Sequence, residues 1–267
     1  MRLSYGKEFM VVAELVDGCK IDCALCWNKS RRPSMHNMTL ETVELVLKKY
    51  GRKYPIDWFN WGDPLLHKDI ITIAQMSKNY RTKISSSFSM HLTPSHFDAL
   101  NNFKTIIVSL SGMNKQTYNI YHKNGNFKLV IKNLMALCEN KNTRIVLRWL
   151  SHKYNQGQLE LMKDFCSKHN IEYEIVGLNC EVENLLTNFD HPLIKKEKFK
   201  TKKKSCKIFN WPTIATDGFY LLCCATHNIK TGPHIKDNIT TEQLIETKNK
   251  IPICQACQQF KFWKMFC

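Results

Sequence analysis

The sequence predicts an α/β protein built around a mostly parallel sheet, and three observations support this class. Six short apolar runs rich in β-branched residues alternate with segments of helical periodicity. The runs are almost continuously apolar, as in parallel strands covered on both faces. The chain has 267 residues, 43% of them hydrophobic, enough for one barrel-sized domain and a small appendage. A partial barrel and an open doubly wound sheet both fit, and in either one ligands bind at the carboxyl ends of the strands.

The strands and helices follow one another in regular order along the chain. Helical periodicity is clearest at 39–50, 126–140 and 156–169, and Thr39 is expected to cap the first of these helices. The six expected strands lie at 9–16, 56–61, 83–88, 105–111, 144–150 and 171–178.

After the sixth strand the alternation stops. The next segment is polar and ends in the run KKEKFKTKKK, so it is expected to be a lysine-rich linker. The last part of the chain carries six cysteines on short segments and is expected to depend on bound metal for its fold. Within it, GFYLLCC at 218–224 is expected to be a turn glycine leading into a strand. The predicted boundaries are 1–180 for the barrel, 181–204 for the linker and 205–267 for the small domain.

Composition narrows the class of protein further. The first residues, MRLSYGKEFM, lack the apolar stretch of a secretory signal, and no apolar run approaches the roughly 18 residues of a membrane helix. A cytoplasmic protein without a membrane partner is therefore expected, and its twelve cysteines indicate metal binding or catalysis rather than disulfides. The net charge of +16 would suit nucleic acid, but the lysines are spread along the whole chain, which indicates general composition instead.

Three cysteines follow the first strand in the stretch DGCKIDCALCW. Cys19, Cys23 and Cys26 can hold three irons of a [4Fe–4S] cluster and leave the fourth iron open to a small molecule. A structural zinc site would need a fourth protein ligand, and the next histidine is the distant His36. The non-enzymatic alternative is a zinc-stabilised basic protein that binds nucleic acid.

These motifs resemble those of the radical S-adenosylmethionine (radical SAM) superfamily. CKIDCALC matches its C-x3-C-x2-C signature, and NWGDPLLH at 60–67 resembles its Gly-Gly-Glu-Pro segment. The stretch at 108–134 resembles its fourth strand and following helix. The resemblance implies a partial (β/α)6 barrel and an enzyme whose reduced cluster cleaves SAM to a 5′-deoxyadenosyl radical, which then abstracts hydrogen from a substrate C–H bond. It also implies a flavodoxin- or ferredoxin-type reductant.

The same resemblance implies a set of contacts to SAM. Trp61 and Asp63 stand where the family has a glycine and a glutamate, although Asp63 keeps the carboxylate that can accept from the SAM amine. Ser86 and Ser87 end the third strand, where contacts to the ribose are usual, and Arg148 would meet the SAM carboxylate. The implied SAM-binding residues are Trp61, Gly62, Asp63, Ser87, Ser109, Ser111 and Arg148.

Four of the later cysteines form two separated groups. Cys206 and Cys223 belong to a C-x11-G-x4-C arrangement, and Cys254 and Cys257 form a C-x2-C pair. Local chemistry alone allows either a second iron–sulfur cluster or a four-thiolate zinc site. Joined to a radical SAM domain, they resemble the twitch/SPASM-type extension of that family, which holds an auxiliary [4Fe–4S] cluster.

Three further cysteines have separate interpretations. Cys224 is expected to be a buried neighbour of the cluster, although an exchange of ligands with Cys223 stays open, and Cys267 is expected to be a stray thiol. Cys180, at the end of the sixth strand, is either a small buried hydrophobe or a donor that returns a hydrogen atom to a substrate radical.

The function expected from these features is oxidation of a polar, sugar-like metabolite with help from the auxiliary cluster. The alternative is modification of a peptide, by epimerisation or by forming a crosslink. The positive charge would suit an acidic or phosphorylated substrate in either case.

Overall fold

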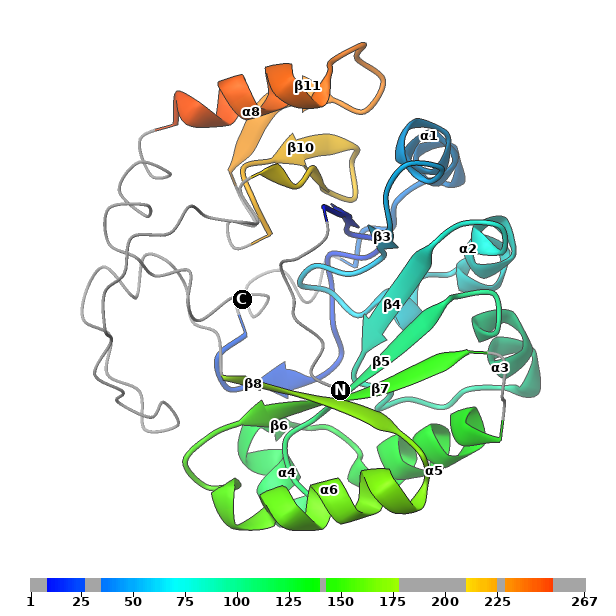
Figure 1. Ribbon diagram of the computed structural model, residues 1–267, viewed down its shortest axis with the longest axis vertical. Helices are drawn as coiled ribbons and strands as arrows, with labels where there is room; N and C mark the ends of the chain where they lie inside the picture. Colours follow the sequence, from blue (N-terminus) through cyan, green and yellow to red (C-terminus); the bar gives the residue numbers. More distant parts are fainter. Residues whose placement is uncertain (1–8, 27–34, 140–142, 178–209, 225–228, 252–267) are drawn as a thin grey trace.

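The computed structural model describes residues 9–26, 35–139, 143–177, 210–224 and 229–251 (Figure 1). Six parallel strands lie side by side in the order in which they occur along the chain. A doubly wound sheet would reverse this order partway, so the sequential order confirms the partial barrel. The six strands are β1 (Val11–Ala13), β3 (Ile56–Asp57), β4 (Thr82–Ser86), β5 (Thr105–Leu110), β7 (Arg144–Ser151) and β8 (Glu172–Gly177).

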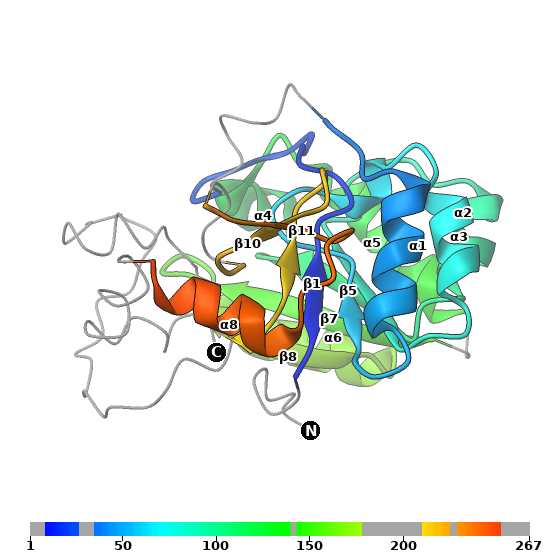
Figure 2. The ribbon, with the colours of Figure 1, turned by 90° about the horizontal axis from the view of Figure 1, so that it is seen from above.

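Helices cover the outer side of this curved sheet (Figures 1 and 2). Thr39 caps α1 (Leu40–Tyr50), because its Oγ1 accepts from the backbone N–H of Thr42 at 3.2 Å, as predicted. The shorter helices have only seven or eight residues, too few for their periodicity to stand out. The other outer helices are α2 (Ile70–Ser77), α3 (Pro94–Leu100), α4 (Lys115–Tyr121), α5 (Phe127–Cys138) and α6 (Leu159–Lys168).

The strands bury different chemistry on their two faces. Outward side chains such as Ile84, Ile106 and Trp149 are fully buried in one apolar cluster with residues of the helices. The neighbouring inward positions carry polar and charged side chains, among them Lys83 and Arg148. This alternation follows from the two-residue period of a strand.

The described residues from 210 onward continue the same sheet, whereas the predicted linker at 181–204 lies outside the described residues. β9 (Thr213–Ile214) pairs in parallel with β1, and β10 (Phe219–Leu221) and β11 (Lys230–His234) extend it in antiparallel fashion. Gly218 has φ of +84°, which confirms the turn glycine expected before a strand. The helix α8 (Thr241–Asn249) follows, and the hydroxyls of Tyr50 and Tyr220 join α1 to β10 at 2.6 Å.

Two predicted strands are shorter than expected. β1 and β3 end several residues before 16 and 61, and the residues after them form loops at the carboxyl end of the barrel. In the part of the chain that the structure describes, no helix has the length and apolar character needed to cross a bilayer.

Candidate active site

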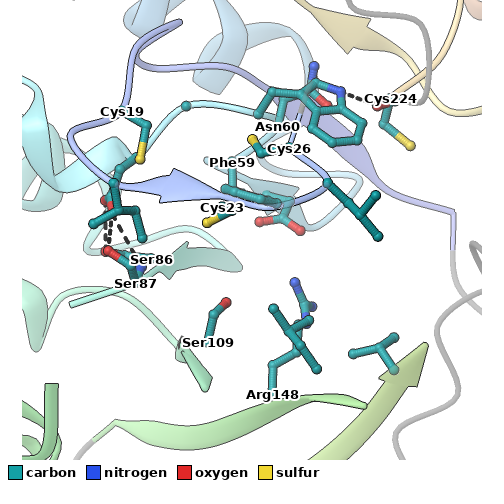
Figure 3. A pocket seen from close by; sticks show the side chains of 18 of the residues that line it. Cys19, Cys23, Cys26, Phe59, Asn60, Ser86, Ser87, Ser109, Arg148 and Cys224 are labelled. Carbon is teal, nitrogen blue, oxygen red and sulfur yellow. Dashed lines mark hydrogen bonds between the residues drawn. The ribbon is translucent and has the colours of Figure 1, made fainter. Parts of the chain in front are cut away.

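A cavity of about 260 Å³ opens at the carboxyl ends of the barrel strands (Figure 3). The loop that carries the three cysteines forms one wall, and Ser109 and Arg148 lie across from it (Figure 3). This is the position where ligands bind in parallel α/β barrels. Of the sequence-predicted SAM contacts, the cavity is lined by Trp61, Gly62, Asp63, Ser86, Ser87, Ser109 and Arg148.

The cysteine loop is anchored at its start and near its middle. Asp17 accepts two hydrogen bonds from His36, through the backbone N–H and ring Nδ1, each at 2.8 Å. Within the loop, β2 (Asp22–Cys23) pairs with β6 (His122–Lys123) as a small antiparallel sheet. These contacts hold Cys19, Cys23 and Cys26 half-buried on the cavity wall.

The arrangement of Cys19, Cys23 and Cys26 can be compared with what zinc and an iron–sulfur cluster each require. Among the described residues, no three His, Cys, Asp or Glu side chains converge on one metal ion. A single tetrahedral zinc would require such convergence, whereas each iron of a [4Fe–4S] cluster takes its own thiolate. The three half-buried thiols on one side of the cavity are compatible with such a cluster.

Gly62 occupies a place where no other residue fits. A Cβ atom there would come within 1.8 Å of the backbone oxygen of Val16. The buried carboxylate of Glu14 accepts from the backbone N–H groups of Trp61 and Gly62 at 3.0 and 3.2 Å, and so holds this segment against the end of β1. Sequence reasoning missed Glu14, although a carboxylate inside an apolar strand run is itself a signal of a specific buried contact.

Asp63 connects the loop after β3 to the end of β4 through hydrogen bonds. Its two oxygens accept from the hydroxyls of Ser86 and Ser87, both at 2.7 Å, and from the backbone N–H groups of Ser87 and Leu65, both at 3.2 Å. Burial raises the pKa of this carboxyl, while these hydrogen bonds oppose the rise. Asp63 thus ties the loop after β3 to the end of β4, in addition to lining the cavity.

Arg148 reaches the cavity as half of an ion pair. Its Nε donates to Glu174 on β8, and its Nη1 donates to the hydroxyl of Ser85 at 3.3 Å. Both charged side chains are largely buried. Because Glu174 already balances its charge, Arg148 is less free to bind a carboxylate than the sequence suggested.

The prediction that Ser111 faces SAM requires correction. Its side chain is fully buried and does not line the cavity. Its hydroxyl instead lies 2.6 Å from Nδ1 of His122 and donates to the backbone oxygen of Tyr118 at 3.2 Å. β5 ends at Leu110, so the alternation that directs Ser109 inward does not extend to Ser111. Sequence reasoning did not single out His122, which does line the cavity.

The later cysteines are only partly covered by the structure. Cys180, Cys206, Cys254, Cys257 and Cys267 lie outside the described residues, so their assigned roles stay predictions. Cys223 and Cys224 are half-buried, and Cys224 lines the cavity. The indole N–H of Trp61 donates to the backbone oxygen of Cys224 at 2.7 Å, which joins this segment to the barrel (Figure 3).

The lining of the cavity is largely apolar and aromatic apart from its cysteines. Its polar groups include Asp57, which is paired with Lys83 at 3.1 Å, and Asn60. Within the described part of the chain, the buried Nδ2 of Asn60 has no hydrogen-bond partner. A buried donor of this kind can serve a ligand. The apolar side chains that line the cavity include Met10, Val12, Phe59, Trp61, Leu150, Val176 and Trp211.

Comparison with known proteins agrees with this site. The family model "Radical SAM superfamily" matches residues 14–166. The chain therefore belongs to the radical SAM superfamily, a family of enzymes that use SAM and a [4Fe–4S] cluster. No curated protein sequence matches the chain.

Solved structures share the fold at low identity. Streptococcus suis SuiB bound to the precursor peptide SuiA is similar with a TM-score of 0.68 and 13% identity, over 96% of this chain and 67% of that one. Native anSMEcpe with bound AdoMet has a TM-score of 0.65 and 12% identity, over 95% and 83% of the two chains. BtrN in complex with AdoMet and 2-DOIA has a TM-score of 0.52 and 15% identity, over 97% and 88%.

Proposed function

We propose that Cys19, Cys23 and Cys26 bind the [4Fe–4S] cluster and that SAM lies between this loop and the end of β4. When bound, the cluster and SAM supply a radical that abstracts hydrogen from a substrate. The protein's own groups orient the reactants. Gly62 lets the chain approach closely, and Asp63 with Ser86 and Ser87 holds the rim of the cavity rigid.

The substrate that the cavity supports best is a peptide with an apolar or aromatic side chain. The observation that carries this proposal is the group of apolar and aromatic side chains that line the cavity, namely Phe59, Trp61 and Trp211 with Met10 and Val12. Aromatic and aliphatic side chains bind such a lining by excluding water. Two structures with a similar fold contain peptides, namely SuiB with SuiA and anSMEcpe with Cp18Cys.

A second candidate is the oxidation of a polar, sugar-like metabolite. It is favoured by the polar groups that line the same cavity, namely Asp57, Arg148 and the buried amide of Asn60. BtrN, which shares the fold, is in complex with AdoMet and 2-DOIA. In this candidate the polar groups bind hydroxyls or amines, and the aromatic side chains pack on the carbon skeleton.

The auxiliary cluster belongs to the proposal as well. Cys206, Cys223, Cys254 and Cys257 would hold it, and it would accept an electron from the substrate radical in an oxidation. Cys180 would act only if the outcome is an epimerisation, by returning a hydrogen atom. A flavodoxin- or ferredoxin-type protein would supply the electron that starts the reaction.

The first experiment measures 5′-deoxyadenosine formed from SAM by anaerobically reconstituted, dithionite-reduced protein. The wild type is compared with a variant in which Cys19, Cys23 and Cys26 are all alanine. Loss of product in the variant alone, together with loss of about four irons per chain, is expected. Equal product in both proteins would overturn the assignment of the cluster.

Substrate class is tested by adding candidate compounds and measuring the rise in 5′-deoxyadenosine above the level with SAM alone. If a peptide is the substrate, peptides with aromatic or aliphatic residues raise the yield, and Trp211→Ala abolishes the rise while Asp57→Asn keeps it. If a metabolite is the substrate, polyols and aminopolyols raise the yield, and Asp57→Asn is the more damaging change.

A further inference from the structure

The cysteine loop is joined by backbone hydrogen bonds to β6 and the end of α4, which lie about a hundred residues further along the chain. Cys23 on β2 pairs with His122 on β6, and the backbone N–H of Ala24 donates to the oxygen of Tyr121 at 2.8 Å. The middle of the loop is thereby joined to the end of α4 by backbone hydrogen bonds.

His122 is held in place by a hydrogen bond to a buried hydroxyl. Nδ1 of His122 lies 2.6 Å from the hydroxyl oxygen of Ser111, and either atom can be the donor. The same hydroxyl lies 3.2 Å from the backbone oxygen of Tyr118, in the helix that precedes His122. These contacts fix the orientation of the imidazole ring.

Packing fixes the ring from another side. His122 is 2% exposed and stacks on the fully buried ring of Tyr118, with centroids 4.6 Å apart and an interplanar angle of 14°. The backbone oxygen of His122 accepts from Gly125 at 3.0 Å, which closes the turn after β6. Tyr118, His122 and Gly125 thus form one packed unit next to the strand that pairs with the cysteine loop.

We propose that Ser111 and His122 are positioning residues that hold the cysteine loop in the conformation needed to bind its cluster. Neither residue is a metal ligand in this proposal, and both act through the backbone pairing between β6 and β2. The inference rests on the proposed assignment of the cluster to Cys19, Cys23 and Cys26. Groups that orient metal ligands in this indirect way commonly change metal affinity by ~10-fold or more when they are removed.

The test uses Ser111→Ala, which removes the hydroxyl, and His122→Phe, which keeps the stacked ring but removes its nitrogens. Ser77→Ala is the matched control, because it also removes a buried hydroxyl bonded to a ring nitrogen, that of Trp58 at 3.1 Å, away from the loop. Two quantities are measured on full-length protein. One is the hydrogen exchange of the Ala24 amide without iron, and the other is the rate at which a chelator removes iron from the SAM-responsive cluster, followed by EPR.

Both loop variants are expected to exchange the Ala24 amide faster than the control and to lose the SAM-responsive EPR signal at least ~10-fold faster. Their thermal midpoints without iron should stay close to that of Ser77→Ala. Amide protection and cluster loss equal to those of the control would overturn the inference. Wild-type protein that takes up no SAM-responsive cluster would overturn the proposed function instead, so the two failures are distinct.

Discussion

The outer and inner faces of the same barrel strands differ in what they bury. Trp149 points outward from β7 and is fully buried in the apolar core, whereas its neighbour Arg148 points inward and pairs with Glu174. Apolar burial stabilises a fold by about 25 cal/mol per Å². A buried ion pair adds little or nothing, because desolvation offsets its attraction. The outer face therefore contributes more to the stability of the barrel than the ion pairs of the inner face do.

The largest effect is expected from the outer face. Trp149→Ala should lower the free energy of unfolding by about 3–5 kcal/mol, because it leaves a large cavity among residues that cannot collapse around it. Urea denaturation followed by circular dichroism measures this loss. Leu150→Ala, at the next residue but on the inner face, should cost clearly less because Leu150 is only half-buried. Equal losses would contradict the difference between the faces.

Breaking the inner ion pair comes next. Arg148→Met should cost about 3 kcal/mol of stability, because it leaves the buried Glu174 carboxylate without its ionic partner. The double variant Arg148→Met, Glu174→Met should recover most of that loss, again measured by urea denaturation. If the double variant is as unstable as the single one, the pair stabilises the barrel after all.

Removing one tryptophan hydrogen bond on each side of the barrel compares the inner and outer faces directly. Trp61→Phe removes the bond to Cys224 on the inner side, and Trp58→Phe removes the bond to Ser77 on the outer side. Each change should cost at least about 1 kcal/mol of stability, because it removes the hydrogen bond and also part of the indole ring. Only Trp61→Phe should speed alkylation of Cys224 by iodoacetamide, followed by mass spectrometry of the tryptic peptide. Equal alkylation rates in the two variants would show that Trp61 does not hold this segment.

The smallest effect concerns the dependence of stability on pH. His152, at the end of β7, is buried and bonds the backbone oxygen of Ser111 at 3.1 Å. Burial lowers its pKa below the ordinary 6.5, with the hydrogen bond to Ser111 opposing the shift. Below pH 6.5 the unfolded chain therefore binds a proton at His152 more readily than the native state does. The contribution of neutral His152 to the free energy of unfolding is thus present above pH 6.5 and decreases as the pH falls.

His152→Gln should flatten the dependence of unfolding free energy on pH below about pH 6.5, relative to wild type. Unfolding in urea at several pH values measures the slope in both proteins. A wild-type slope in the His152 variant would contradict the assignment.

Most of the barrel could be predicted from the sequence. The six apolar runs appear as six parallel strands, and Thr39 caps its helix as expected. The helices α2 and α3 were not predicted individually, because two turns give too few apolar positions to establish a period. The ends of β1 and β3 were predicted too long, because apolar residues after a strand continue its pattern even where the chain has left the sheet.

The site was only partly predictable. The spacing of the three cysteines and the segment around Gly62 identified one wall of the cavity. Ser111 was wrongly directed into it, because the strand ends one residue earlier. Glu14 and His122 have no sequence motif, and their roles follow only from the backbone groups they meet in the folded chain.

What the sequence determined by itself is local. The two-residue alternation assigns a face to each strand residue, and the cysteine spacing sets which thiols can share a cluster. The tertiary structure alone decided which distant segments meet. It pairs Cys23 with His122, Trp61 with Cys224, and β1 with β9. Each of these contacts uses at least one backbone group, and because every residue carries such groups, no local pattern marks the partner in advance.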